Sequence, residues 1–312
     1  MFEIRRYTKA DAKVWNSYVA TAKNATFLFD RGYMEYHEDR FTDFSLLFYL
    51  KGKLYALLPA HAINHTLYSH FGLTYGGLIM NRQVTAASTV TLFEELNTYL
   101  RSADIHQVVY RPAPSIYHQL PAEEDLYAIW RVCHAQVVAR DISSTIILDR
   151  QLTWRQGRKE GINRCNHHNI LIERSENYAA FWEILTDNLS QKYHAQPVHS
   201  LEEILWLKKQ FPENIQLFVA RKNECILGGT VLYITPQVVH TQYISASLEG
   251  KKYGVIDAIF HQILHIEYTH YRYFDFGKST EQGGLELNKS LIFQKEGFGG
   301  RGICYDTYEW KP

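Results

Sequence analysis

The feature that constrains the fold most is the order of the expected strands and helices, which is nearly the same in both halves of the chain. In residues 169–310 the spacing of apolar residues predicts a strand, two helices, three strands, a helix, a strand, a helix and a last strand. Residues 2–140 give nearly the same order, although the residues themselves do not repeat. We therefore expect an α+β fold of two tandem domains, each a central, mostly antiparallel mixed sheet flanked by helices. The boundary falls within 140–150, which gives domains of residues 1–143 and 144–312.

Composition supports two ordinary globular domains. Of the 312 residues, 46% are hydrophobic and 21% are charged, which suffices for two cores. The 33 lysines and arginines balance 33 aspartates and glutamates, which argues against an extensive nucleic-acid surface. The start of the chain lacks the apolar stretch of a signal peptide, and no apolar run approaches the ~20 residues of a membrane span. We therefore expect a cytoplasmic protein without a transmembrane segment.

The cysteines and clustered histidines do not predict a metal site. The four cysteines are scattered without a C-x-x-C pair, so neither a disulfide framework nor a zinc ribbon is indicated. Cys165, His167 and His168 lie close in sequence, but one cysteine and two adjacent histidines do not provide a tetrahedral ligand set. We expect no metal cofactor.

The stretch 273–284, YFDFGKSTEQGG, contains the Asp-Phe-Gly triplet with which protein kinases bind magnesium. A kinase also needs a glycine-rich phosphate loop and a His-Arg-Asp catalytic loop, and this sequence has neither. The stretch therefore predicts a strand that ends in a polar, glycine-rich loop, where functional side chains are frequent.

The preceding segment, QYISASLEGKKYGVIDAIFHQIL, predicts a strand, a basic turn and a helix. Free N–H groups and the helix dipole at such a helix start favour an anion, and a glycine lets a phosphate approach the backbone. We expect a donor-phosphate site formed by Lys251, Lys252, Tyr253, Gly254 and Val255. The alternative is an ordinary turn with solvated lysines.

These two segments together resemble the central motif of GNAT acyltransferases. The tail FDFGKSTEQGGLELNKSLIF is similar, more specifically, to the FemAB-related branch, which consists of two fused GNAT-like domains. The resemblance covers most of 150–312 and rests on Asp275, Phe276, Gly277, Ser279, Gly284, Leu285, Lys289, Phe298 and Gly299. One departure is Ile256, which stands where GNAT turns usually carry glycine or alanine, so that a bulky side chain would crowd a pyrophosphate.

The resemblance implies acyl transfer at a point where two strands splay apart. An acceptor amine loses a proton to a carboxylate or histidine, and backbone N–H groups hold the oxyanion. Donor contacts are expected at Ser245, Ala246 and Ser247, in the domain that carries the acyl-donor site. The polar candidates around the splay are His240, Tyr243, Asp275, Ser279, Glu281 and Lys289. For three of these there is an ordinary structural alternative: Asp275 as an orienting group, and Glu281 and Lys289 as solvated charges.

The N-terminal domain is expected on the acceptor side. Residues 68–79, YSHFGLTYGGLI, combine aromatic, hydroxyl and glycine residues, which predicts either an acceptor-binding loop or a packed β-bulge. The expected contacts are His70, Thr74, Tyr75 and Gly76. Arg158, from the basic stretch RQGRKEGINR, is added as a contact to acceptor phosphates, with a solvated helix face as the alternative.

The function that the resemblance implies is transfer of an acyl group, first of all acetyl, from acyl-CoA to an amine. The acceptor is a small-molecule, sugar-type, peptide-type or lipid-linked amine, in a cell-envelope or polysaccharide setting. The first alternative is a FemAB-type, aminoacyl-tRNA-dependent transferase that extends a peptidoglycan peptide; the neutral charge disfavours tRNA as a partner. The second alternative is a non-catalytic binding protein with a degenerate GNAT fold.

Overall fold

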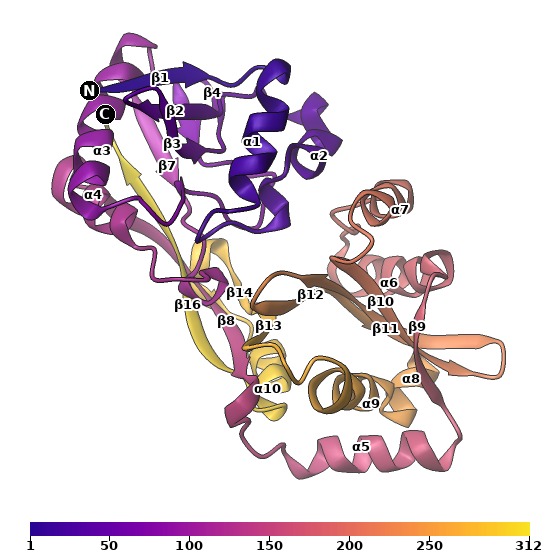
Figure 1. Cartoon of the computed structure of the whole chain (residues 1–312). Coiled ribbons are helices and arrows are strands. Elements are labelled where there is room, and N and C mark those ends of the chain that lie inside the picture. Colours follow the sequence, from indigo (N-terminus) through magenta and orange to yellow (C-terminus); the bar gives the residue numbers. More distant parts are fainter. The chain divides into compact units, whose positions relative to one another are not determined.

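The chain folds into two compact units that are not simple halves of the sequence (Figure 1). The computed structural model describes the backbone of residues 1–312 and all side chains except those of residues 192 and 193. Unit 1 contains Met1–Asp141, Thr280–Glu286 and Cys304–Pro312, and unit 2 contains Ile142–Ser279 and Leu287–Ile303. The predicted single boundary at 143/144 differs from this division, because two C-terminal segments group with the N-terminal unit.

Unit 1 combines two groups of paired strands with helices. Strands β1, β2, β3 and β6 form a sheet in that order, and β5 pairs in parallel with β7, which pairs antiparallel with β16. The elements are β1 (Phe2–Arg6), α1 (Ala12–Val19), α2 (Arg31–Met34), β2 (Leu46–Leu50), β3 (Lys53–Leu58), β4 (His61–Ile63), β5 (Thr66–Tyr68), β6 (Ile79–Met80), α3 (Ala86–Ser102), β7 (Gln107–Tyr110), α4 (Glu124–Cys133), β14 (Thr280–Glu281) and the ends of β8 (Gln136–Ile147) and β16 (Arg301–Trp310). Helix α3 begins and ends where the apolar periodicity predicts, and it packs Leu92, Phe93 and Leu96 into the core.

Unit 2 is built on a mixed sheet with the strand order β8-β13-β12-β11-β10-β9. All its neighbouring strands are antiparallel except β12 and β13, which are parallel. Helices α6 and α7 cover one face of this sheet, and α5, α8 and α9 lie on the other (Figure 1). Its elements are α5 (Gln156–His167), β9 (Leu171–Ser175), α6 (Tyr178–Tyr193), α7 (Leu201–Gln210), β10 (Ile215–Lys222), β11 (Cys225–Ile234), β12 (Val238–Ala246), α8 (Leu248–Tyr253), α9 (Val255–Gln262), β13 (Tyr273–Lys278) and α10 (Lys289–Gly297), with β15 (Glu286–Leu287) at the division.

Local sequence signals explain several of these boundaries. Ser200 and Glu203 form the predicted capping box at the start of α7, since each side chain accepts a hydrogen bond from the other's backbone N–H group. The basic segment after β12, predicted as a turn, forms helix α8, whose C-cap is Gly254 at φ +74°. The predicted helix follows as α9 and continues into a π-helical turn at Ile263–Glu267. The 3₁₀ turns are Lys9–Asp11, Phe27–Phe29, Glu35–Arg40, Ser115–Tyr117, Leu148–Arg150 and Gln282–Gly284. None of the described helices has the length and apolar composition that a bilayer-spanning segment requires.

Candidate active site in unit 2

The candidate site lies where strands β12 and β13 separate. Their parallel pairing runs only from Val238 and Tyr273 to His240 and Asp275. Beyond this point β12 stays paired with β11, after a bulge opposite Val231 and Leu232, while β13 stays next to β8. A wedge therefore opens between the two strands, as expected at this position. Bulges next to such openings re-aim side chains and end strand pairing.

A cavity of about 360 Å³ lies at this wedge. Its wall is mainly apolar and comes from α6, β12, α9, β13 and α10; it includes Leu189, Ile244, Phe260, Phe276 and Leu291. The polar side chains in the lining are those of Asn188, Ser245, Lys251, Gln294 and Lys295. An apolar hollow with a few convergent polar groups is the usual form of a small-molecule site.

Lys295 is the charged group in the cavity wall that the sequence analysis missed. Its side chain is 5% exposed, and Nζ donates hydrogen bonds to the backbone oxygens of Gly277 (2.8 Å) and Lys278 (2.7 Å). Burial lowers the pKa of Lys295 to about 8, although the negative charge of Asp275 opposes this shift. An ammonium has three N–H donors, so one remains for a group in the cavity. The available signal was helical spacing, because Leu291, Gln294, Lys295 and Phe298 share one face of α10.

Asp275 forms a buried dyad with His240 at the apex of the wedge. His240 Nδ1 lies 2.8 Å from Asp275 Oδ2, and the other carboxylate oxygen accepts hydrogen bonds from Ser143 (2.5 Å) and Thr145 (2.9 Å). Asp275 is fully buried, and its carboxylate is bound by the imidazole and by two hydroxyl groups of β8, so that it is in a position to orient His240. In the tautomer that donates Nδ1–H to the carboxylate, Nε2 carries the lone pair. Gly277, at φ +75°, leaves room for the ring, since a Cβ there would lie 3.2 Å from His240 Cε1.

None of the predicted catalytic residues, His240 and Asp275 included, is in the lining of the cavity. Tyr243 is bound to His199, with its hydroxyl 2.6 Å from Nδ1, and burial raises the pKa of Tyr243 to about 12. Ser279 is buried, and its Oγ has no hydrogen-bond partner among the described residues. Glu281 is exposed in β14, which groups with unit 1, and Lys289 is exposed at the first position of α10.

The predicted donor-binding residues divide into two groups. Ser245, Ala246 and Lys251 line the cavity, and Lys251 Nζ donates to Asn188 Oδ1 at 2.5 Å. Ser247 caps α8 through the backbone N–H of Gly250. This end of the predicted site therefore lies at the cavity.

The remaining predicted donor contacts lie elsewhere. Gly254 packs against helix α5, because a Cβ on it would lie 2.5 Å from the Cα of Gly161. Val255 is fully buried in the core, Tyr253 accepts a hydrogen bond from Lys222, and Lys252 is exposed. The space beside Gly254 is thus filled by a helix, which corrects the expectation that a phosphate approaches the backbone there. Ile256 lines the cavity.

Of the predicted acceptor residues, His70 lines a cavity of about 400 Å³ in unit 1, together with Arg31, His37 and Phe41. The pKa of His70 is lowered to about 3, mainly by burial and to a smaller extent by the neighbouring His61.

The rest of that loop is closely packed. A Cβ on Gly76 would lie 1.9 Å from the backbone oxygen of Ser69, and the buried Tyr75 donates to Thr26. Thr74 is half-buried. These contacts favour the structural alternative for Tyr75 and Gly76.

Arg158 fastens three helices of unit 2 together. It pairs with Asp257 at 2.8 Å, donates to the backbone oxygen of Gln294 at 3.1 Å and lies over the ring of Phe298 at 4.2 Å. These contacts connect α5, α9 and the end of α10. Arg158 therefore does not lie on a solvated helix face, and its guanidinium binds groups of unit 2.

Comparison with known structures identifies the fold. The structure of FemX superposes with a TM-score of 0.68 at 8% identity, covering 99% of this chain and 97% of that one. L-PGS from Bacillus licheniformis gives 0.61 at 11% identity over 97% and 91%, and a tandem GNAT protein from the clavulanic acid biosynthesis pathway gives 0.52 at 9% identity over 100% and 98%. No protein-family model and no curated protein sequence matches the chain. The predicted tandem GNAT-like fold with FemAB-related structural relatives is confirmed.

Proposed function

We propose that the chain is an acyltransferase that moves an acyl group from an activated donor to an amine. The observation that carries this proposal is the cavity at the β12/β13 wedge, with the buried ammonium of Lys295 in its wall. In acyl transfer the donor carbonyl oxygen gains negative charge, and a fixed cation in a poorly hydrated cavity stabilises it strongly. The mainly apolar wall suits an acyl chain or the narrow, extended part of the donor to which the acyl group is attached.

The dyad supplies the proton acceptor for the same reaction. Phe274 and Phe276 belong to the core under α9, so the intervening Asp275 and its partner His240 point to the other face of the sheet. We infer that the amine approaches from the His240 face and that Nε2 takes its proton. The amine nitrogen then bonds to the acyl carbon, the bond from that carbon to the leaving sulfur or oxygen breaks, and the leaving group departs as a thiol or hydroxyl after taking the proton from Nε2. Asp275 holds Nδ1–H and is a positioning residue.

The proposed donor is acyl-CoA, and the second candidate is an aminoacyl-tRNA, as the FemAB resemblance implies. Two contacts favour the second candidate: Gly161 fills the space next to Gly254, and the side chain of Ile256 lines the cavity. The proposed acceptor is a sugar-type, peptide-type or lipid-linked amine of the cell envelope. Within unit 1, the cavity at His70 is the candidate acceptor pocket, and the exposed Glu281 is a further candidate contact of that unit. The exposed Lys289 is a candidate contact of unit 2.

Donor binding tests the proposal first. Binding is measured on the full chain. Calorimetric titration is used for acetyl-CoA and CoA, and filter binding is used for charged and uncharged tRNA. Leu291→Trp places a larger side chain into the cavity from α10. Ser290→Trp adds the same side chain at the neighbouring exposed position and is the matched control. We expect binding that is at least about tenfold weaker in Leu291→Trp and unchanged in Ser290→Trp.

The outcomes separate the candidates. Acetyl-CoA binding that Leu291→Trp weakens supports the CoA-dependent reaction. A preference for charged over uncharged tRNA, lost in the same variant, supports the aminoacyl donor. If neither donor binds to the wild-type chain, the transferase proposal is wrong and the degenerate binding protein replaces it.

A further inference from the structure

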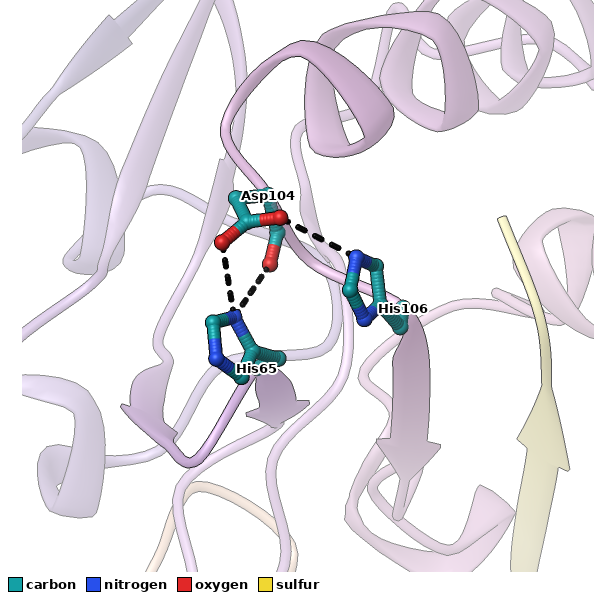
Figure 2. A group of neighbouring side chains, drawn as sticks. All are labelled: His65, Asp104 and His106. Carbon is teal, nitrogen blue, oxygen red and sulfur yellow. Dashed lines mark hydrogen bonds and ion pairs between the residues drawn. The ribbon is translucent and has the colours of Figure 1, made fainter.

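Two imidazoles and a carboxylate converge on the surface of unit 1. His65 lies in the turn between β4 and β5, and Asp104 and His106 lie between α3 and β7. His65 Nδ1 is 2.9 Å from Asp104 Oδ2, and His106 Nε2 is 3.0 Å from Asp104 Oδ1. Figure 2 shows the carboxylate facing a nitrogen of each ring. This arrangement, the His65–Asp104–His106 cluster, has no part in the proposed acyl transfer.

The backbone of the two loops sets the positions of these side chains. Strands β5 and β7 are parallel neighbours with Thr66 opposite Gln107, and the N–H of His106 donates to the backbone oxygen of His65 at 2.8 Å. The two rings are stacked, with centroids 5.1 Å apart and planes 14° apart. Ligands 39 positions apart in sequence are thus joined by a strand pair, which explains why a search for neighbouring ligands predicted no metal site.

We propose that the His65–Asp104–His106 cluster binds one divalent ion of the zinc class. One ligand atom from each residue lies within 4.8 Å of the others. A tetrahedral zinc ion with bonds of 2.0–2.2 Å needs ligand atoms about 3.3 Å apart, so a small rotation of exposed side chains closes the site. Two imidazoles and one carboxylate are a ligand set that late first-row ions accept.

Exposure determines what the ion does in this site. The side chains are 57%, 69% and 70% exposed for His65, Asp104 and His106, so water fills the remaining coordination position. The ion links the β4–β5 turn to the loop before β7 and stabilises unit 1, because it binds the folded chain and not the unfolded one. We expect a dissociation constant in the micromolar range and a thermal midpoint that rises with zinc.

The test uses the full chain, without an affinity tag and freed of metal by EDTA. Zinc binding is measured by calorimetry, and cobalt binding by its visible absorption. The variants are His65→Asn, Asp104→Asn and His106→Ala. Asparagine is chosen at 65 and 104 because both residues have positive φ (62° and 60°), a conformation that asparagine tolerates. The matched control is His167→Ala, which removes an exposed imidazole that also lies next to a second histidine, with the two rings in an edge-to-face arrangement.

We expect one zinc per wild-type chain, binding at least about tenfold weaker in each of the three variants, and no change in His167→Ala. Thermal midpoints in EDTA, equal among wild type and variants, establish that the chains are folded. Zinc raises the midpoint of the wild type and of His167→Ala only. The proposal is overturned if no stoichiometric binding occurs, or if all three variants bind as the wild type does.

Discussion

At the residue scale, the buried ammonium of Lys295 is the group whose state controls the proposed chemistry. Burial among the apolar side chains of the cavity disfavours the charged form of Lys295. The two backbone oxygens and Asp275 favour the charged form, but they offset the effect of burial only in part. With a pKa of about 8, the group is mostly charged at neutral pH and becomes neutral under mildly alkaline conditions. If the charge of Lys295 stabilises the transfer reaction, the reaction therefore requires a pH below about 8.

This shift predicts how stability depends on pH. Because the pKa falls from 10.5 in the unfolded chain to about 8 in the folded one, the unfolded state binds more protons between these values. The free energy of unfolding of the wild type, relative to Lys295→Met, should therefore rise with pH from about 8 to 10.5 and be constant outside this window. Urea titrations at each pH measure it. Lys289→Met, on the exposed side of α10, is the control substitution. The prediction is contradicted if the difference in unfolding free energy between the wild type and Lys295→Met does not change with pH.

The two lysines also show what sequence patterns can resolve. Lys289 matches the spacing of the FemAB motif, and Lys295 lies six positions later on the same helix. Six residues rotate a helical position by about 240°, so the two side chains point to different sides. Which side faces the wedge depends on how α10 packs, and no local pattern encodes that packing. By contrast, Asp275 was correctly placed next to the splay, because alternation along β13 is a local property.

At the element scale, the break between α8 and α9 shows how tertiary packing changes the meaning of a motif. The sequence correctly predicted strand β12 and helix α9, but the basic segment between them, predicted as a turn, forms helix α8. It could not predict that Gly161 of α5 would occupy the space left by the missing side chain of Gly254. A glycine in a basic turn is compatible with a phosphate or with a second backbone, and only the folded chain distinguishes the two.

This contact makes Gly254 a packing position with a measurable cost of substitution. Gly254→Ala should lower the free energy of unfolding by about 2–4 kcal/mol, since it adds both backbone strain at φ +74° and a clash with Gly161. Gly52→Ala is the matched control: it has the same φ of +74° but no atom within 4 Å of the added Cβ, so about 1 kcal/mol is expected. Denaturant unfolding measures both. Equal losses would mean that the α5 contact contributes nothing.

At the scale of the whole molecule, unit 1 contains segments that are distant in sequence from its main part. Periodicity predicted the repeated order of elements, and the comparison of structures confirmed the tandem fold. Periodicity could not assign the last strand, because strand pairing is decided by non-local contacts. Residues Cys304–Pro312 group with unit 1, where Tyr308 pairs with Tyr110 of β7.

Unit 1 should therefore not fold from residues 1–143 alone. Trp310 is 4% exposed in the core of unit 1, and its Nε1 donates to Asn97 at 3.0 Å. Loss of such a side chain costs about 3–5 kcal/mol, a large part of the 5–15 kcal/mol that stabilises a typical domain. Removing the strand also exposes the edge of β7. We expect fragment 1–143 to show neither near-ultraviolet circular dichroism nor a cooperative thermal transition.

A second chain tests whether the missing strand is the cause. Residues 142 and 302 are in contact, since a Cβ on Gly302 would lie 2.8 Å from the side chain of Ile142, and Arg140 pairs with Asp306 at 2.6 Å. Strands β8 and β16 therefore lie side by side and run in opposite directions here. An Asn-Gly turn can join residue 143 to residue 301 and make the two strands a hairpin. This joined chain should unfold cooperatively, and Trp310→Ala should remove that transition. A cooperative transition in fragment 1–143 itself would show that the predicted boundary already encloses a complete domain.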